Sequence, residues 1–145
     1  MRAPQSVLFV CSENALRSPM AEAIAKRLHG ATVYIDSAGV RDGELDALAV
    51  AVLDEIGVDL SQHRAKRLED LNDTSFDLVV TLSPEAHHWA LQMSRASAAE
   101  VEYWVTADPS AIEGTRDMRL QAYRELRDML IARIAARLAD SPAAG

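Results

Sequence analysis

The sequence is poor in cysteine, and it lacks a long apolar run. Its 145 residues include a single cysteine, Cys11, so no disulfide can form within the chain. A free thiol is typical of a reducing compartment. No apolar stretch approaches the roughly 18 residues that span a bilayer. The first such stretch is cut short by Ser12, Glu13 and Asn14, before it has the length of a signal peptide. We therefore expect a cytoplasmic protein.

Basic residues are also in short supply. Lysine and arginine together number 15 against 22 aspartate and glutamate residues, which gives a formal net charge of −7 and a pI of about 5.0. Proteins that bind nucleic acid or anionic membranes generally need a basic surface. The charge balance therefore predicts no nucleic-acid partner and no membrane partner, although it permits a small cationic pocket.

The rest of the composition is that of a globular protein, with 49% hydrophobic and 26% charged residues. The length predicts a single domain over 1–145. Its last residues, 140–145, are small or polar and predict a frayed tail.

Short apolar runs alternate with amphipathic patterns along the chain. The runs predict buried strands at 6–10, 32–36, 76–82 and 101–105, and apolar residues at helical spacing predict helices at 18–28, 45–56, 83–93 and 115–138. This alternation predicts an α/β fold in three layers, with helices on both faces of a parallel sheet. Ligands of such sheets bind at the carboxyl ends of the strands.

The loop after the first strand has the composition of an oxyanion site. In "VLFVCSENALRSPMAEAI" the strand stops at Cys11, and Arg17 and Ser18 begin the next helix. The N–H groups of such a loop favour anions, and an arginine fork suits two oxygens of a phosphate. Positive surroundings favour the thiolate form of a cysteine, and a hydroxyl at Ser18 would hydrogen-bond it. The loop therefore predicts a thiolate nucleophile below an oxyanion cradle.

A second loop supplies an acid. Asp108 precedes Pro109 in "TADPSAIEGT", which follows the fourth predicted strand and opens on the same sheet edge as Cys11. Attack on a phosphate monoester expels an alkoxide or phenoxide that needs a proton. Asp108 is the candidate to provide that proton and then to activate the hydrolytic water.

These motifs resemble one family. "VCSENALRSPMAEAI" is similar to the Cys-x-x-Asn-x-x-Arg-Ser loop of the low-molecular-weight protein tyrosine phosphatases and of the arsenate reductases that share their fold. Downstream, "IDSAGV", "GVDLSQHRAKRL", "FDLVVTL" and the Asp-Pro loop resemble further family segments in the same order. The resemblance covers nearly the whole chain.

The resemblance implies a role for each of four residues. Cys11 would be the nucleophile, Arg17 the oxyanion clamp, Ser18 the stabiliser of the thiolate and Asp108 the general acid and base. It also implies the strand order 2-1-3-4, and chemistry without a metal or an organic cofactor.

The loop itself would bind the oxyanion and keep its shape through buried polar groups. Oxyanion contacts are expected from the residues between the nucleophile and the clamp, together with Arg17: Ser12, Glu13, Asn14, Ala15 and Leu16. A hydrogen bond between Asn14 and Ser37, in the "DSAG" turn, would hold the loop.

The sequence departs from the family at several points. Glu13 and Leu16 stand where the phosphatases commonly have glycine and a second cysteine, so we expect Glu13 to point outward, away from the anion. No aromatic residue follows Asp108-Pro109 to wall a phosphotyrosine ring. The further cysteines through which thioredoxin-coupled arsenate reductases relay electrons are also missing.

The leading hypothesis from the sequence is a cysteine-dependent phosphomonoester hydrolase acting on a phosphorylated protein or a small phosphomonoester. The alternative is an arsenate reductase that uses an external thiol. A catalytically silent oxyanion-binding module is the third hypothesis. Two features favour the arsenate reductase alternative: the absence of aromatic residues just after Asp108-Pro109, and the Asp-Pro…Gly-Thr pattern.

Overall fold

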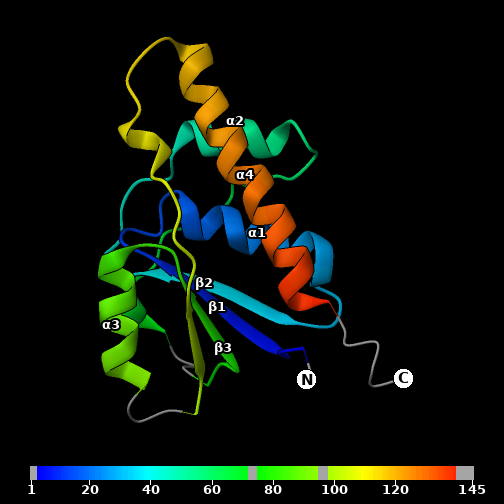
Figure 1. Cartoon of the computed structure of the whole chain (residues 1–145), viewed down its shortest axis with the longest axis vertical. Coiled ribbons are helices and arrows are strands. Elements are labelled where there is room, and N and C mark those ends of the chain that lie inside the picture. The colour runs from blue at the N-terminus through cyan, green and yellow to red at the C-terminus, as the bar shows by residue number, and fades with distance from the viewer. Residues whose placement is uncertain (1–2, 72–74, 95–97, 140–145) are drawn as a thin grey trace.

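Four short parallel strands form the centre of the structure, a computed structural model that describes residues 3–71, 75–94 and 98–139 (Figure 1). The predicted tail at 140–145 lies outside the described residues. The sheet has the order β2-β1-β3-β4. Its strands are β1 (Ser6–Cys11), β2 (Tyr34–Gly39), β3 (Leu78–Thr81) and β4 (Glu100–Tyr103). Both the strand order and the parallel pairing predicted above are confirmed.

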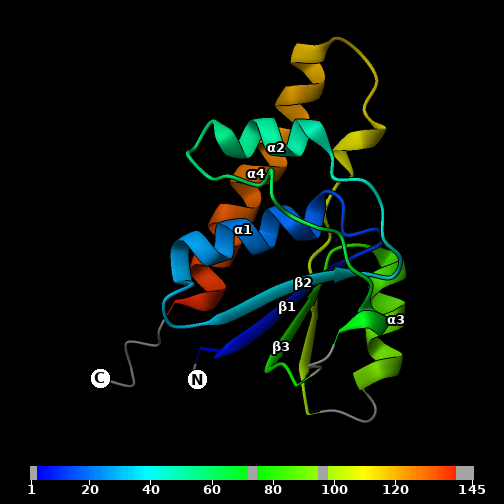
Figure 2. The same cartoon turned by 180° about the vertical axis from the view of Figure 1, so that it is seen from behind.

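Helices cover both faces of the sheet and complete three layers. Figures 1 and 2 show α1 (Arg17–His29), α2 (Ala47–Asp54) and α4 (Arg116–Leu138) on one face and α3 (Pro84–Ser94) on the other. Two 3-10 turns lie in the connections, η1 (Leu68–Asp70) and η2 (Pro109–Ala111). None of the helices in the described part of the chain is long and apolar enough to cross a membrane.

The central strand explains why its sequence is a continuous apolar run. Val7 and Phe9 join the large core under α1, α2 and α4, whereas Leu8 and Val10 join a smaller core with Ala86 of α3. All four side chains are at most 3% exposed. A strand that is buried on both faces needs apolar residues at every position.

The second strand runs from Tyr34 to Gly39 rather than over the predicted 32–36, so the residues expected to turn after position 36 belong to the strand. Its last residues pair in register with β1, with Phe9 opposite Ser37 and Cys11 opposite Gly39. Strand pairing therefore overrides the turn propensity of Ser and Gly. Glycine is required at 39, since a Cβ there would lie 2.7 Å from the backbone nitrogen of Asn14.

Hydroxyl side chains cap the N-termini of two helices. At α3, the Ser83 hydroxyl accepts a hydrogen bond from the Ala86 nitrogen at 3.2 Å, and at α4 the Thr115 hydroxyl accepts one from Met118 at 3.2 Å. Helix α2 is shorter than the predicted 45–56 and ends at Asp54. Ile56 is consequently 38% exposed rather than part of the apolar face.

Candidate functional site

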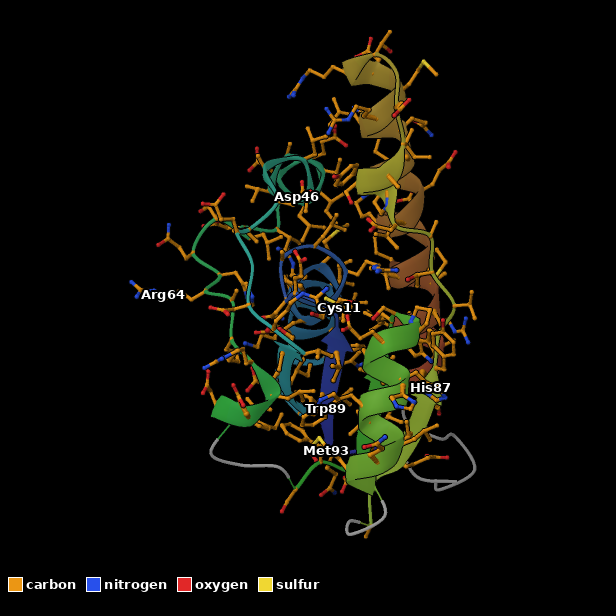
Figure 3. All side chains as sticks on the ribbon, turned by 90° about the vertical axis from the view of Figure 1, so that its left-hand side faces the viewer. Cys11, Asp46, Arg64, His87, Trp89 and Met93 are labelled. Atoms are coloured by element: carbon orange, nitrogen blue, oxygen red, sulfur yellow. The ribbon has the colours of Figure 1, made fainter. Side chains whose placement is uncertain are left out.

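The single thiol lies at the carboxyl end of β1, just before the loop that leads into α1. Figure 3 shows Cys11 at this edge of the sheet, with Asp46 on the segment that enters α2. Cys11 is 4% exposed. Its sulfur lies 2.9 Å from the hydroxyl oxygen of Ser18, in the first turn of α1. The residue pair that the sequence predicted is thus brought into hydrogen-bond contact.

Asn14 holds the loop in an unusual backbone conformation. Its φ of +53° is the one positive value among non-glycine residues in the described ranges, and asparagine tolerates this left-handed region better than most residues. The side chain is fully buried. Its Nδ2 donates to Ser18 Oγ at 2.8 Å and to Ser37 Oγ at 3.0 Å. Its Oδ1 accepts from the Lys66 backbone nitrogen at 3.0 Å and faces His63 Nε2 at 3.0 Å. The amide therefore uses its full hydrogen-bonding capacity.

Ser18 connects this network to the thiol. Because Asn14 donates to the Ser18 oxygen, the Ser18 proton is available for another acceptor. The Ala38 carbonyl is a distant alternative at 3.5 Å, and Cys11 Sγ is nearer at 2.9 Å. The Ser18 hydroxyl is therefore placed to donate to Cys11 Sγ.

Glu22 is a buried member of the network that sequence analysis missed. It is 7% exposed and accepts a hydrogen bond from Ser37, and it pairs with Lys26 Nζ at 2.6 Å. His63 Nδ1 lies 3.8 Å from the same carboxylate. Burial lowers the pKa of His63, and the Glu22 charge partly opposes this effect. The available signal was an acid four residues after Ser18, on the helix face of Ala21 and Ala25.

We expect Asn14→Ala to lower the free energy of unfolding by about 3 kcal/mol, because buried partners lose their hydrogen bonds and alanine is strained at positive φ. Asn14→Gly should recover about 1 kcal/mol of that loss, since glycine accepts this backbone conformation. Urea unfolding of the three proteins measures both effects. An alanine variant as stable as the wild type would contradict this role of Asn14.

A cavity of about 430 Å³ opens above Cys11. It is lined by Cys11, Ser12, Glu13, Ala15, Leu16, Arg17, Arg41, Glu44, Asp46, Asp108 and Ser110. No aromatic side chain is among these lining residues, so the described walls offer no ring against which a phenyl group would stack. Trp104, four residues before Asp108, is 1% exposed and packs edge-on against Phe9 in the core.

Asp108 reaches this cavity from the connection between β4 and α4, which climbs past the carboxyl ends of the strands (Figures 1 and 2). One oxygen of its exposed carboxylate accepts from the Ser110 nitrogen at 3.0 Å and from the Ser110 hydroxyl at 2.6 Å. Arg17 is tied to the same connection, because its Nη1 donates to the carbonyl and hydroxyl oxygens of Thr106, each at 3.3 Å. The two loops that the sequence placed at one sheet edge thus share one cavity.

The departures from the family pattern have simple structural solutions. The Glu13 side chain is 53% exposed and lies 3.7 Å from Arg41 Nε, so its charge is directed outward. Leu16, at the position where the phosphatases commonly have a second cysteine, is 8% exposed and packs in the main core. Arg41 is a second arginine at the cavity that sequence analysis did not single out. Its Nη1 donates to both carboxylate oxygens of Glu85 at 2.9 Å.

Metal ligands do not gather anywhere in residues 3–71, 75–94 and 98–139. No three histidine, cysteine, aspartate or glutamate side chains in these ranges form a cluster of the kind that holds a metal ion. His87 packs against the sheet. It stacks on Tyr103 with ring centres 4.7 Å apart, and its Nδ1 lies 3.1 Å from the Thr81 hydroxyl.

Comparison with known proteins identifies relatives of two kinds. Residues 6–136 match the family model described as low molecular weight phosphotyrosine protein phosphatase. The glutaredoxin arsenate reductase of Synechocystis sp. is 31% identical over 140 residues, which covers 90% of this chain and 98% of that protein.

Similar solved structures include both arsenate reductases and tyrosine phosphatases. An arsenate reductase in its phosphate-binding state superposes with a TM-score of 0.73 at 26% identity, covering 93% of this chain and 99% of the other. The low molecular weight protein tyrosine phosphatase of T. tengcongensis gives a TM-score of 0.72 at 31% identity, covering 90% and 95%.

Proposed function

Since the chain belongs to the low molecular weight phosphotyrosine protein phosphatase family, we propose that it is a thiol-dependent arsenate reductase that takes its reducing thiols from other molecules. The observation that carries the proposal is the cavity itself. Cys11 and Arg17 line the cavity, Ser18 Oγ lies 2.9 Å from Cys11 Sγ, and no aromatic ring is among the lining residues. A tetrahedral oxyanion without an organic substituent needs no such ring.

The similarity to arsenate reductases supports this choice over the phosphatase hypothesis that the sequence alone favoured. The Synechocystis protein matched over 98% of its length is an arsenate reductase, as are relatives from Halalkalibacterium halodurans, Shouchella clausii and Bacillus subtilis at 30–32% identity. This chain has a single cysteine. A reduction carried out by this chain must therefore draw its further thiols from a donor such as glutathione or another small thiol.

The proposed reaction begins with attack by the Cys11 thiolate on arsenic. A sulfur–arsenic bond forms, and one arsenate oxygen leaves as water after gaining protons. Arg17 and the loop N–H groups neutralise the three remaining oxygens. The Ser18 hydroxyl, 2.9 Å from Cys11 Sγ, is placed to donate to the attacking thiolate.

Reduction occurs when an external thiolate attacks Cys11 Sγ. The sulfur–arsenic bond breaks, its electron pair stays on arsenic, and arsenite leaves. Cys11 remains in a mixed disulfide with the donor. A second donor thiol then displaces Cys11 as thiolate, so that one arsenate consumes two thiols and gives one donor disulfide, one arsenite and one water.

Phosphomonoester hydrolysis is the second candidate, and the position of Asp108 favours it. A carboxyl group on the wall of the Cys11 cavity suits the protonation of an alkoxide or phenoxide. The same carboxylate would then activate water against the cysteinyl phosphate. Both candidates share the first step, attack by the Cys11 thiolate on a bound tetrahedral oxyanion.

One preparation assayed for both activities tests the proposal. We expect arsenite to form from arsenate in the presence of glutathione, 2-mercaptoethanol or dithiothreitol, with two thiol groups oxidised for each arsenite. Hydrolysis of p-nitrophenyl phosphate is measured in parallel. Hydrolysis without arsenite would replace the proposal with the second candidate. Phosphate binding without either activity would identify a silent oxyanion-binding module.

A further inference from the structure

The mouth of the Cys11 cavity carries more negative than positive side chains. Four of its lining residues are carboxylates: Glu13, Glu44, Asp46 and Asp108. Two are arginines, Arg17 and Arg41. The floor is different, because Arg17 and the loop N–H groups provide positive charge next to the thiol. The charge that lines the cavity is therefore positive at its floor and mainly negative at its rim.

The two arginines do not cancel this rim charge. Arg17 belongs to the oxyanion cradle and is compensated by the bound anion. Arg41 is engaged by Glu85 at 2.9 Å on two oxygens and by Glu13 at 3.7 Å. The hydrogen bond and charge of Glu85 raise the pKa of Arg41. The group formed by Arg41, Glu13 and Glu85 thus has two carboxylates for one guanidinium.

Three carboxylates at the cavity have no cationic partner within the described residues. Asp46 accepts from the backbone nitrogens of Leu48 and Ala49 and from the Tyr123 hydroxyl at 2.7 Å, all of which are neutral donors. Asp108 accepts from Ser110 alone. Glu44 is exposed and forms no side-chain hydrogen bond or ion pair in the described part of the chain.

We propose that this rim, and Glu44 in particular, selects the thiol that attacks Cys11, favouring uncharged or cationic low-molecular-weight thiols over anionic ones. The inference rests on the proposed use of an external thiol. Only the sulfur of such a donor reaches Cys11, because the thiol of Cys11 is 4% exposed at the bottom of the cavity. The substituent of the donor stays at the rim, where its charge meets Glu44 and Asp108.

The oxyanion and the donor are consequently recognised at different depths. Arsenate is neutralised on the floor by Arg17 and the N–H groups. A donor with two carboxylates and one ammonium group, such as glutathione, places net negative charge among carboxylates and is expected to attack slowly. An uncharged thiol or an aminothiol avoids this repulsion.

The test follows attack on Cys11 without arsenate, in the presence of inorganic phosphate, which takes the place of arsenate beside Arg17. Cys11 is first converted to its 2-pyridyl disulfide with the uncharged reagent 2,2′-dithiodipyridine. Cysteamine, 2-mercaptoethanol and mercaptoacetate then attack Cys11 Sγ and release pyridine-2-thione, whose absorbance gives the rate. Each rate is divided by that of the same thiol with the pyridyl disulfide of N-acetylcysteine amide, which corrects for intrinsic thiol reactivity.

We expect the corrected rate for cysteamine to exceed that for mercaptoacetate by about fivefold or more at an ionic strength of roughly 0.01 M, and the difference to shrink toward unity at about 1 M. Glu44→Gln should lower this ratio by about twofold at low salt. The matched control is Asp42→Asn, which removes one exposed negative charge from the same loop but does not line the cavity, and it should leave the ratio unchanged.

Equal corrected rates for the three thiols, or a faster reaction of mercaptoacetate, would overturn the proposal. An equal effect of Glu44→Gln and Asp42→Asn would overturn the assignment to Glu44. The exchange contains no arsenate, so its outcome is separate from that of the proposed function. A protein that lacks arsenate reductase activity can still show the charge order, and an active reductase can fail to show it.

Discussion

Replacing Cys11 with serine is expected to abolish arsenite formation and phosphomonoester hydrolysis alike, with a loss of about ten-thousandfold or more in either rate. The serine hydroxyl remains protonated near neutral pH, so the sulfur–arsenic or sulfur–phosphorus bond of the first step has no equivalent. Ser18, which lies 2.9 Å from Cys11 Sγ, is itself an alcohol and cannot serve as a base toward another alcohol. Steady-state rates of the two proteins in both assays provide the measurement.

Binding of inorganic phosphate separates loss of chemistry from loss of the site. The proposed cradle consists of Arg17 and the loop N–H groups, and the side chain of Asn14 holds the loop through hydrogen bonds that do not involve Cys11. Titration calorimetry should therefore show that Cys11→Ser still binds phosphate. Turnover within tenfold of the wild type would rule out Cys11 as the nucleophile in both proposed reactions. Lost binding with a normal unfolding curve would show that the thiolate itself shapes the cradle.

Much of the fold could be predicted because its determinants are local. The apolar run of β1, buried on both faces, and the capping serine and threonine at Ser83 and Thr115 act within a few residues of the elements they specify. The end of β2 could not be placed in the same way. Its residues Ser37 and Gly39 favour a turn by themselves, and they form a strand because β1 lies beside them.

In the site, too, residues close in sequence could be predicted together, and residues far apart in sequence could not. Cys11, Arg17 and Ser18 lie in one loop and the turn that follows it, so spacing alone brings them together. Glu22 and His63 meet only because the loop between α2 and η1 packs against α1 and the loop at Asn14. Arg41, in the loop after β2, is held at the cavity by an ion pair with Glu85 of α3. Contacts between residues far apart in sequence leave little trace in a single sequence, whereas an isolated acid on a buried helix face is a partial signal.

Replacing Asp108 with asparagine should distinguish the two candidate functions by the reaction that it impairs. The measure is kcat/KM, which includes departure of the leaving group but not the later hydrolysis of the cysteinyl phosphate. We expect its value for an alkyl phosphate to fall by about a thousandfold, because the alkoxide cannot leave without a proton from the enzyme. Hydrolysis of p-nitrophenyl phosphate should fall by only about tenfold, since nitrophenolate is a good leaving group. Arsenate reduction should change least, because arsenate carries acidic hydroxyl groups that supply the proton for the departing oxygen.

The substitution is conservative for the structure, so a difference between substrates reports on proton transfer. The asparagine carbonyl oxygen can still accept from the Ser110 nitrogen and hydroxyl, which preserves the turn that places residue 108 on the cavity wall. Glu113→Gln is the matched control, because it removes an exposed carboxylate from the same connection outside the cavity. Equal losses for alkyl phosphate, p-nitrophenyl phosphate and arsenate would refute an acid role. Asp108 would then serve the site through the negative charge of the rim, and its loss should speed attack by anionic thiols.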